Sequence, residues 1–277
     1  MMAESPVPPL AAGPTSTVEV RRWRAGATRL ESDELAVEAP LEIRLGKSPI
    51  TVVMRTPGND EELVAGFLFD EGIIDGAADI KALSRPPLLS DAERGNVIAV
   101  ELAQGARRAP SERLFFSVAA CGVCGKRSLG ELEMEAPLID APLRVERSLL
   151  AQLPDRLRAA QPIFDRTGGL HGAGLFTAQG ELLCAREDIG RHNAVDKVVG
   201  WALGAGRLPL ADAILVVSGR LGYEIAQKGI MAGTPIIASV GAASSLAVEL
   251  GKRYGVTLAT FVRADGMNVF GPAERVV

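Results

Sequence analysis

Two of the three cysteines of this chain lie three positions apart in a short loop, Cys121-Gly122-Val123-Cys124-Gly125-Lys126-Arg127. This spacing lets both sulfurs face one small volume, and the glycines leave the tip of the loop bare. Lys126 and Arg127 favour the thiolate, which is the form of cysteine that attacks, binds metal or holds a transferable sulfur. We therefore predict that the loop is a site of thiol chemistry.

Three kinds of chemistry are compatible with this loop. Half of a zinc site is normally completed by a second CxxC or a histidine pair, and the remaining candidates, Cys184, His171 and His192, have no paired spacing. A thioredoxin-like disulfide is expected at the start of a helix after the first strand of a βαβ unit, whereas this pair follows a long β-rich region. The third possibility is a cysteine that holds sulfur as a persulfide and hands it on.

The composition is that of an ordinary globular protein. Hydrophobic residues make up 47% of the 277 residues and charged residues 23%, so the chain can form one large domain or two modest ones. The net charge of −4 argues against broad nucleic-acid binding. Few cysteines, two of them in one loop, suit a reducing compartment better than a disulfide framework.

The sequence shows no sign of a membrane segment. The Pro/Ala-rich stretch from Met1 to Thr17 lacks the basic and apolar regions of a signal peptide, and no run of eighteen apolar residues occurs. We therefore expect a cytoplasmic protein without a membrane span.

The first part of the chain, up to about residue 110, is predicted to be rich in β-structure. Alternating or continuous apolar runs predict strands at residues 17–20, 35–38, 41–45, 50–54 and 96–102. One helix is expected after Asn59, a capping residue, because three acids follow it and Leu63, Val64, Phe67 and Leu68 form an apolar stripe that Gly72 ends.

From about residue 165 the pattern changes to strands followed by helices. Continuous apolar runs predict strands at 213–217, 235–240 and 256–262, with helices that end near Met231 and Tyr254. Three such successive steps imply a mainly parallel sheet covered by helices.

Ligands of such sheets bind beyond the carboxyl ends of the strands. Small, hydroxylic or charged residues follow all three predicted strands, in Ser218-Gly219-Arg220, 241–245 and 263–266. Glycines, helix N-termini and arginine suit a phosphate, so we expect a phosphorylated ligand or nucleotide there. No GxGxxG or Walker A sequence is present, which disfavours an ordinary dinucleotide or P-loop site.

Two further clusters are rich in polar residues. His171 lies in a glycine-rich turn at 167–173, and the segment 187–197 contains His192. Asp188 or Asn193 is a candidate cap for the helix that follows in that segment. Cys184 has apolar neighbours and is predicted to be an inert core thiol.

Together these motifs resemble the FdhD family, the formate dehydrogenase accessory sulfurtransferases. The similarity covers nearly the whole chain except the N-terminal tail, and several motifs occur together in the family's order. The matching segments are Cys121-Gly122-Val123-Cys124-Gly125, 187–197, Ser218-Gly219-Arg220 with Tyr223-Glu224, Phe67 with Glu71, Gly72, Ile73 and Ile74, and the run from Ala242 through Leu246 to Glu249.

The resemblance implies an α/β protein (α+β overall) that forms a cytoplasmic homodimer. Residues 165–277 are expected to form a three-layer domain like the cytidine deaminases, with a mainly parallel sheet. A smaller β-rich domain is expected at 17–120, after a disordered tail at 1–16 and before the CxxC loop and a connecting segment at 121–164. The deaminases' His-x-Glu zinc motif is missing, because Gly172 and Ala173 follow His171, so no metal ligand is assigned.

The resemblance also implies a function. The family receives persulfide sulfur from a cysteine desulfurase and delivers it to the molybdenum bis-guanine-dinucleotide cofactor, before or during insertion into the formate dehydrogenase catalytic subunit. The family's persulfide cysteine falls on Cys121, with Cys124 as its neighbour. Arg263 is expected to contact the phosphates and Asp265 the guanine edge. The cofactor-binding segment as a whole falls on Phe261, Val262, Arg263, Ala264, Asp265 and Gly266.

Two functions of other classes stay open. A chaperone that only binds the cofactor and the enzyme would tolerate replacement of Cys121. A zinc-dependent, deaminase-like hydrolase would contain stoichiometric zinc. The sequence does not determine whether the metal served is molybdenum or tungsten, or whether Cys124 relays sulfur.

Overall fold

The computed structural model describes residues 13–86, 93, 95–106 and 136–277. Cys121 and Cys124, and with them the predicted thiol loop, lie outside these residues. The described residues form three sheets, which contain six, four and two strands.

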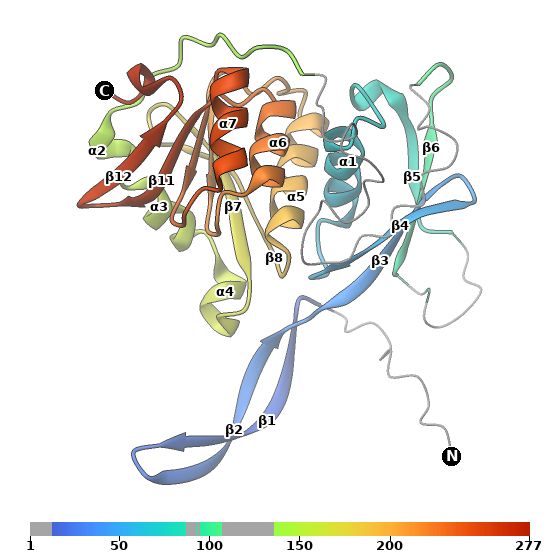
Figure 1. The fold of residues 1–277 in the computed structure, drawn as a ribbon. Helices are drawn as coiled ribbons and strands as arrows, with labels where there is room; N and C mark the ends of the chain where they lie inside the picture. Colours follow the sequence, from blue (N-terminus) through green and yellow to red (C-terminus); the bar gives the residue numbers. More distant parts are fainter. Residues whose placement is uncertain (1–12, 87–92, 94, 107–135) are drawn as a thin grey trace.

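The six-stranded sheet has the strand order β12-β11-β10-β9-β7-β8 (Figure 1). The neighbouring pairs β9–β10 and β10–β11 are parallel, as the successive strand–helix pattern predicts. The other three pairs are antiparallel, so the prediction of a mainly parallel sheet is wrong, and the sheet is mixed. Short turns join β7 to β8 and β11 to β12, and such hairpins need no crossover helix. The strands are β7 (His171–Thr177), β8 (Leu182–Asp188), β9 (Ala213–Val217), β10 (Ile236–Ser239), β11 (Thr257–Arg263) and β12 (Gly266–Phe270).

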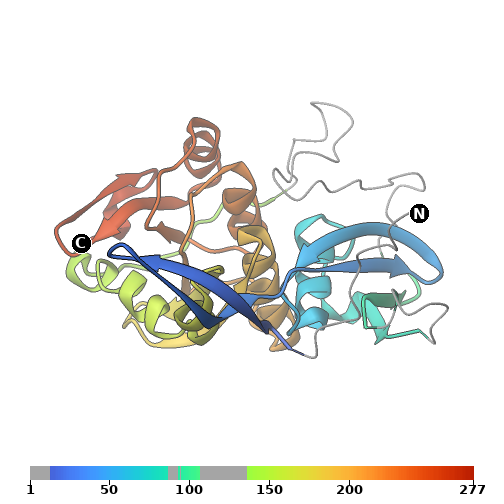
Figure 2. The ribbon, with the colours of Figure 1, turned by 90° about the horizontal axis from the view of Figure 1, so that it is seen from below.

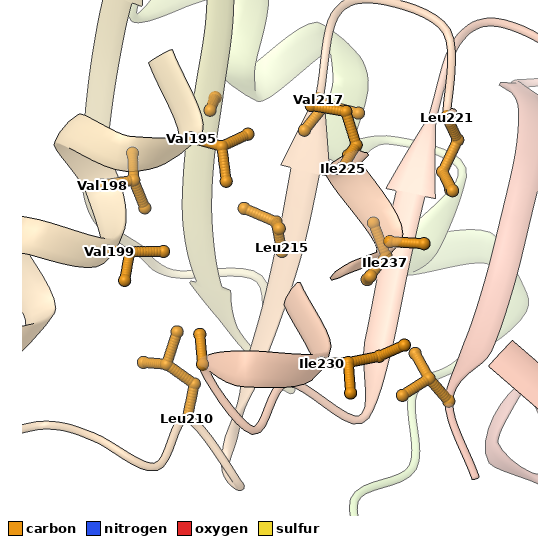
Figure 3. Packing of buried hydrophobic residues seen from close by; sticks show 14 of the residues in the cluster. Val195, Val198, Val199, Leu210, Leu215, Val217, Leu221, Ile225, Ile230 and Ile237 are labelled. Atoms are coloured by element: carbon orange, nitrogen blue, oxygen red, sulfur yellow. The ribbon is translucent and has the colours of Figure 1, made fainter. Parts of the chain in front are cut away.

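Helices cover both faces of this sheet, which explains why its central strands are apolar without alternation. On β9, Leu215 and Val217 pack into one hydrophobic cluster, and Ile214 and Val216 into another on the opposite face. Figure 3 shows the first cluster, where α5 and α6 lie over β9 and β10. The covering helices are α5 (Arg191–Gly204), α6 (Tyr223–Met231) and α7 (Ser245–Tyr254) on this face, with α2 (Arg147–Leu150) and α3 (Leu153–Ala159) on the other, followed by α4 (Pro162–Thr167).

The four-stranded sheet has the order β4-β3-β6-β5 and packs against one long helix, α1 (Asp60–Asp70). Its strands are β3 (Ala39–Leu45), β4 (Ser48–Arg55), β5 (Ile80–Ser84) and β6 (Val97–Leu102), with a short 3₁₀ turn, η1 (Ala77–Asp79), before β5. The helix was expected after Asn59, and its extent agrees. The capping was predicted incorrectly, because Asn59 has a left-handed backbone (φ 56°) and its side chain makes no capping hydrogen bond. The first helical residue, Asp60, is instead anchored by the buried Arg55 at 2.9 Å.

The α1 and α5 helices join the four-stranded unit to the six-stranded one, and they cross at two glycines. A Cβ atom added at Gly66 would lie 1.9 Å from the carbonyl oxygen of Asp196, and one at Gly200 would lie 1.8 Å from that of Glu62. Only glycine permits this approach. Beside the crossing, the Lys228 ammonium of α6 lies 2.5 Å from Asp196 of α5 and 3.6 Å from Asp70 of α1.

The two-stranded sheet is a long hairpin that projects from the rest of the molecule (Figure 1). It consists of β1 (Thr15–Arg24) and β2 (Ala27–Ala36). The expected short strand at 17–20 lies within β1, whereas the expected strand at 35–38 is divided, because β2 ends at Ala36 and β3 begins at Ala39. A 3₁₀ turn, η4 (Ala273–Arg275), follows β12, and none of the described helices is long and apolar enough to cross a membrane.

Candidate ligand site at the carboxyl edge of the six-stranded sheet

The parallel strands β9, β10 and β11 end at one edge of the sheet, which we call the carboxyl edge. Hydrogen bonds connect the three loops that follow these strands. The loops therefore lie together at one edge, as the sequence predicts. The Ser239 hydroxyl donates to the carbonyl of Gly219 at 2.5 Å, and the amide of Phe261 donates to the carbonyl of Gly241 at 3.1 Å. Because β7 is antiparallel to β9, its first residue, His171, lies at the same edge.

The end of β11 holds the predicted cofactor-binding segment in an unusual conformation. Phe261 has a φ of 51°, which is rare for a bulky residue, and its side chain is 45% exposed. The register between β11 and β12 shifts between Thr260 and Arg263, so the strand bulges there. The bulge places Phe261 toward solvent and the next side chain, Val262, in the core at 1% exposure. Of the six predicted residues, Val262 therefore presents no side chain to a ligand.

The last four residues of this segment, 263–266, line a cavity of about 410 Å³. Arg263 and Asp265 face Arg147 and Glu146, which lie at the start of α2. Two guanidinium groups near one cavity suit a diphosphate, and the carboxylates can accept hydrogen bonds from the N–H groups of a base. Arg147 and Glu146 were not predicted as site residues, because nothing in the sequence links residues 146–147 to residues more than a hundred positions later. The remaining lining residues are Ser148, Ala151, Ala264, Gly266, Met267 and Val277.

A second cavity, of about 470 Å³, lies where β9 and β10 end beside α3 and α4. His171, Ser218 and Gln161 supply its uncharged polar side chains, and Asp155 and Arg158 supply charged ones. The Ser218 hydroxyl accepts a hydrogen bond from the Gly172 amide at 2.8 Å, which leaves its own hydrogen available to donate. The Gln161 side chain is 2% exposed, and its Nε2 has no partner among the described residues. The other lining residues are Pro154, Asp155, Leu157, Arg158, Phe164, Gly168, Gly169, Leu170 and Val240.

The electrostatic setting of His171 keeps its imidazole neutral near pH 7. Burial is the largest effect that lowers the pKa of His171, and the positive charge of Arg191 lowers it further. A neutral imidazole both donates and accepts one hydrogen bond, so His171 suits a polar ligand better than an anion. Sequence reasoning placed His171 in a turn, whereas it begins strand β7.

Helix N-termini contribute positive ends of helix dipoles at the same edge. The α5 and α6 helices begin after Gly190 and Gly222, neither of which can cap with a side chain. Their first turns are linked to each other, since His192 Nε2 lies 2.6 Å from a carboxylate oxygen of Glu224. The α7 helix differs because the Ser244 hydroxyl accepts from the Ala247 amide at 3.2 Å.

The polar segment 187–197 is mainly structural. Asp188 is completely buried and accepts hydrogen bonds from the amides of Thr56 and Gly190 at 3.1 and 2.9 Å and from Asn193 at 2.9 Å. The Lys197 ammonium lies 2.7 Å from the same carboxylate and donates to the carbonyl of Thr56 at 3.0 Å. The prediction that Asp188 or Asn193 caps the helix is wrong, because Gly190 is the N-cap. Both residues instead join the six-stranded unit to the four-stranded one, because Asp188 binds Thr56 just after β4 and Asn193 donates to the carbonyl of Met54 within β4 at 2.7 Å.

Cys184 is a core thiol, as predicted. It is 5% exposed in the main hydrophobic cluster, and burial raises its pKa to about 11. A thiol with such a pKa is almost entirely protonated at neutral pH and is a poor nucleophile. In the described ranges, no group of three or more His, Cys, Asp or Glu side chains is arranged to hold a metal ion.

Comparison with known proteins identifies the family. The profile of the FdhD/NarQ family matches residues 36–277. The chain belongs to the FdhD/NarQ family. The matched range includes Cys121, Cys124 and both cavities of the carboxyl edge.

Individual relatives are similar over nearly their whole length. The chain is 48% identical over 269 residues to the sulfur carrier protein FdhD of Streptomyces coelicolor, with 95% of each chain covered. It is 46% identical over 272 residues to the sulfur carrier protein FdhD of Mycobacterium tuberculosis, which covers 95% of this chain and 98% of the relative. A crystal structure described as a formate dehydrogenase accessory protein from Desulfotalea psychrophila superposes with a TM-score of 0.74 at 30% identity, covering 95% of this chain and 99% of the other.

Proposed function

We propose that this protein carries sulfur as a persulfide on Cys121 and transfers it to a molybdenum bis-guanine-dinucleotide cofactor that serves formate dehydrogenase. The observation that carries the proposal is the match to the FdhD/NarQ family over residues 36–277, which include the paired cysteines and the cations beside them. The names of the relatives, sulfur carrier proteins, support the same activity. We further propose that the protein works as a cytoplasmic homodimer.

The loading step is a thiol–disulfide-type exchange. The Cys121 thiolate attacks the terminal sulfur of the persulfide on a cysteine desulfurase. A new S–S bond forms on Cys121, the S–S bond of the donor breaks, and the donor cysteine leaves as a thiolate. Lys126 and Arg127 assist because they stabilise the attacking thiolate.

The delivery step requires two electrons, because the carried sulfur is at the oxidation level of elemental sulfur and leaves as sulfide. Attack of the Cys124 thiolate on the sulfur atom of Cys121 supplies them. Hydrosulfide is released toward the cofactor, and the two cysteines end as a disulfide that a cellular thiol reduces for the next cycle. In this scheme Cys124 is the reductant that releases the sulfur from Cys121, a role that a carrier with a single cysteine would lack.

The carboxyl edge supplies groups that fit the guanosine diphosphate arms of the cofactor. Arg263 and Arg147 line one cavity and suit the phosphates, Asp265 suits the guanine edge, and the exposed ring of Phe261 offers a stacking surface. Strain at Phe261 supports a ligand role, because a bulky residue with positive φ persists only where the surroundings impose it. When bound, the cofactor supplies the metal centre that accepts the sulfur.

We also propose that the six-stranded unit is related to the cytidine deaminases without sharing their hydrolysis. Its central parallel strands covered by helices on both faces agree with such a three-layer fold. The residue that begins β7, His171, is followed by Gly172 and Ala173, so a His-x-Glu zinc motif does not occur there.

Intact-mass analysis after incubation with a cysteine desulfurase and cysteine tests the proposal. Wild-type protein is expected to gain one or more sulfur atoms that a thiol reductant removes, and Cys121→Ala is expected to gain none. Cys184→Ala is the matched control and should load like wild type, because the Cys184 thiol is buried and protonated. Full loading of Cys121→Ala would overturn the persulfide assignment.

The same variant separates the carrier from a chaperone that only binds the cofactor and the enzyme. A chaperone would still activate formate dehydrogenase when Cys121 is replaced, whereas the carrier would not. Metal analysis of the purified protein tests the remaining alternative, since a deaminase-like hydrolase would hold stoichiometric zinc.

A further inference from the structure

The tip of the β1–β2 hairpin is basic and apolar at the same time. Arg21, Arg22, Arg24 and Arg29 lie in the ten positions from 21 to 30, and no acidic residue occurs among them. We use the term arm tip for Arg21, Trp23, Arg24, Arg29 and Leu30. Four positive charges in ten residues contrast with the net charge of −4 of the whole chain.

The apolar side chains of the arm tip form one exposed patch. Trp23 is 76% exposed and Leu30 is 61% exposed. Trp23 pairs with Thr28 and Arg21 pairs with Leu30, so Trp23 and Leu30 are diagonal neighbours on one face of the ribbon, with Arg21 beside them. Trp and Arg are the residue types most enriched among the side chains that dominate binding energy at protein interfaces.

The charges of the arm tip work against the stability of the isolated hairpin. Arg22 and Arg29 are directly opposite each other in the register, and like charges in that position destabilise a strand pair. Arg22 is compensated by Asp33 at 2.8 Å and Glu31 at 3.5 Å. No described residue forms an ion pair or hydrogen bond with the side chain of Arg21, Arg24 or Arg29, so these three guanidinium groups are available to a partner.

The base of the hairpin lies beside the candidate ligand site. Arg166 of α4 pairs with Glu34 of β2 at 2.6 Å and donates to the Thr15 hydroxyl of β1 at 2.6 Å. The Cβ atom of Ala36 is 3.4 Å from the position that a Cβ would take at Gly169, a residue that lines the cavity of about 470 Å³. Beyond this base the ribbon extends outside the layers of the two larger sheets (Figures 1 and 2).

We propose that the arm tip is a docking element for an acidic surface of the protein that receives the cofactor. The inference rests on the proposed function. The arm starts at the rim of the carboxyl edge, so a protein that binds the arm tip is held facing the edge where the cofactor is proposed to bind. Arg21 lies on the same face as the Trp23–Leu30 patch, and Arg24 and Arg29 lie on the opposite face of the ribbon. The guanidinium groups recognise carboxylates, and the patch fills an apolar depression of the partner. A two-stranded ribbon is only marginally stable alone, and docking buries its apolar side chains.

The relatives retain chain in this region. Coverage of 95% leaves about 14 of the 277 residues of this chain unmatched in the Streptomyces coelicolor protein, fewer than the two ten-residue strands of the hairpin contain. The family profile itself begins only at residue 36, where β2 ends. The arm therefore lies outside the region that defines the family, although the relatives also have residues that align with part of it. This is expected of an element that recognises a particular partner.

A charge-reversal pair tests the proposal. Arg24→Glu with Arg29→Glu changes two exposed arginines of the arm tip, and Lys47→Glu with Lys252→Glu makes the same change of charge at exposed positions elsewhere. The probe is the purified apo catalytic subunit of formate dehydrogenase, immobilised for kinetic binding measurements. We expect the arm-tip pair and Trp23→Ala each to weaken binding about tenfold or more. For the charge pair the loss should lie mainly in the association rate and diminish at high salt, whereas the control pair should bind like wild type.

Unchanged binding by the arm-tip variants, or an equal loss in the control pair, would overturn the proposal. A change of oligomeric mass confined to the arm-tip variants would overturn it too, because it would assign the arm to a second copy of this chain. Preferential binding of nucleic acid by wild type over the arm-tip pair would also overturn it. Sulfur loading of Cys121 and binding of GDP are measured on the same variants and should be unchanged. If wild-type protein does not load sulfur, the proposed function is wrong, but the measured binding to the catalytic subunit still tests the role of the arm tip.

Discussion

In the segment from Glu187 to Lys197 the charged side chains are largely buried and paired, whereas in the segment from Phe261 to Gly266 they face solvent. Asp188 has four donors around its carboxylate, while no described residue forms an ion pair or hydrogen bond with the side chain of Arg263 or Asp265. Buried charges of the first kind stabilise only through their partners, and exposed charges of the second kind are free to bind a ligand. The density of polar residues in a motif is therefore not a sign of a ligand site. The two segments differ in whether their charged side chains already have partners within the protein.

Removal of the Asp188 carboxylate should have the largest effect. Asp188→Ala leaves the Lys197 ammonium buried without its counter-ion, and such a change costs about 3–5 kcal/mol of unfolding free energy. Chemical denaturation followed by circular dichroism measures it. Asp265→Ala is the matched control on the exposed segment and should change the unfolding free energy by less than about 0.5 kcal/mol. Similar losses in both variants would contradict the contrast between the segments.

Replacement of Arg263 should affect ligand binding and leave stability unchanged. Arg263→Ala is expected to cost about 1.5–3 kcal/mol of GDP binding, the range for a hydrogen bond to a charged group. That loss corresponds to roughly tenfold to more than a hundredfold in affinity. Calorimetric titration measures it, with Arg220→Ala as the control at the neighbouring loop. If Arg220→Ala weakens binding and Arg263→Ala does not, the guanosine site belongs to the loop after β9.

The pH dependence of stability should show the smallest effect, through His171. Its pKa is lower in the folded protein than the usual value of about 6.5, so the unfolded chain binds the proton more readily. The unfolding free energy is therefore fully retained above the ordinary histidine pKa and falls as the pH drops from there toward the folded pKa. His171→Gln should flatten this part of the profile, measured by urea denaturation across the same pH range. An unchanged slope would mean that His171 is protonated as easily in the folded protein as in the unfolded chain.

The sequence predicted the central elements well, because burial on both faces leaves a plain pattern. The apolar runs at 213–217 and 256–262 correspond closely to β9 and β11. The start of strand β7, residues 171–173, was mistaken for part of a turn because the segment is rich in glycine, whereas the glycines of β7 serve packing. A Cβ at Gly172 would lie 2.5 Å from the Gln161 side chain, and one at Gly174 would lie 3.0 Å from Leu157. The mixed character of the sheet follows from β7, β8 and β12, and it was missed because none of these three segments was predicted as a strand.

The candidate site was only partly predictable. Arg263 and Asp265 could be located because they follow a clear strand, and the structure places both beside a cavity. Gln161 and Arg147 could not, since they lie at the starts of short helices whose packing against the sheet depends on contacts between distant parts of the chain. The length of the hairpin was also missed, because both of its faces are largely exposed and therefore lack the alternation that marks a strand.

The glycine crossing of α1 and α5 has a consequence for how the protein can be dissected. Gly66 and Gly200 allow the two helices to touch backbone to backbone, and Lys228 from one unit reaches Asp70 of the other. Severing the chain between the units would expose this seam and leave the buried Asp70 without the positive charge of Lys228. The two units are therefore not independent modules. Through these contacts with α5 and α6, whose first turns lie at the carboxyl edge, the β-rich unit helps to hold that edge in place.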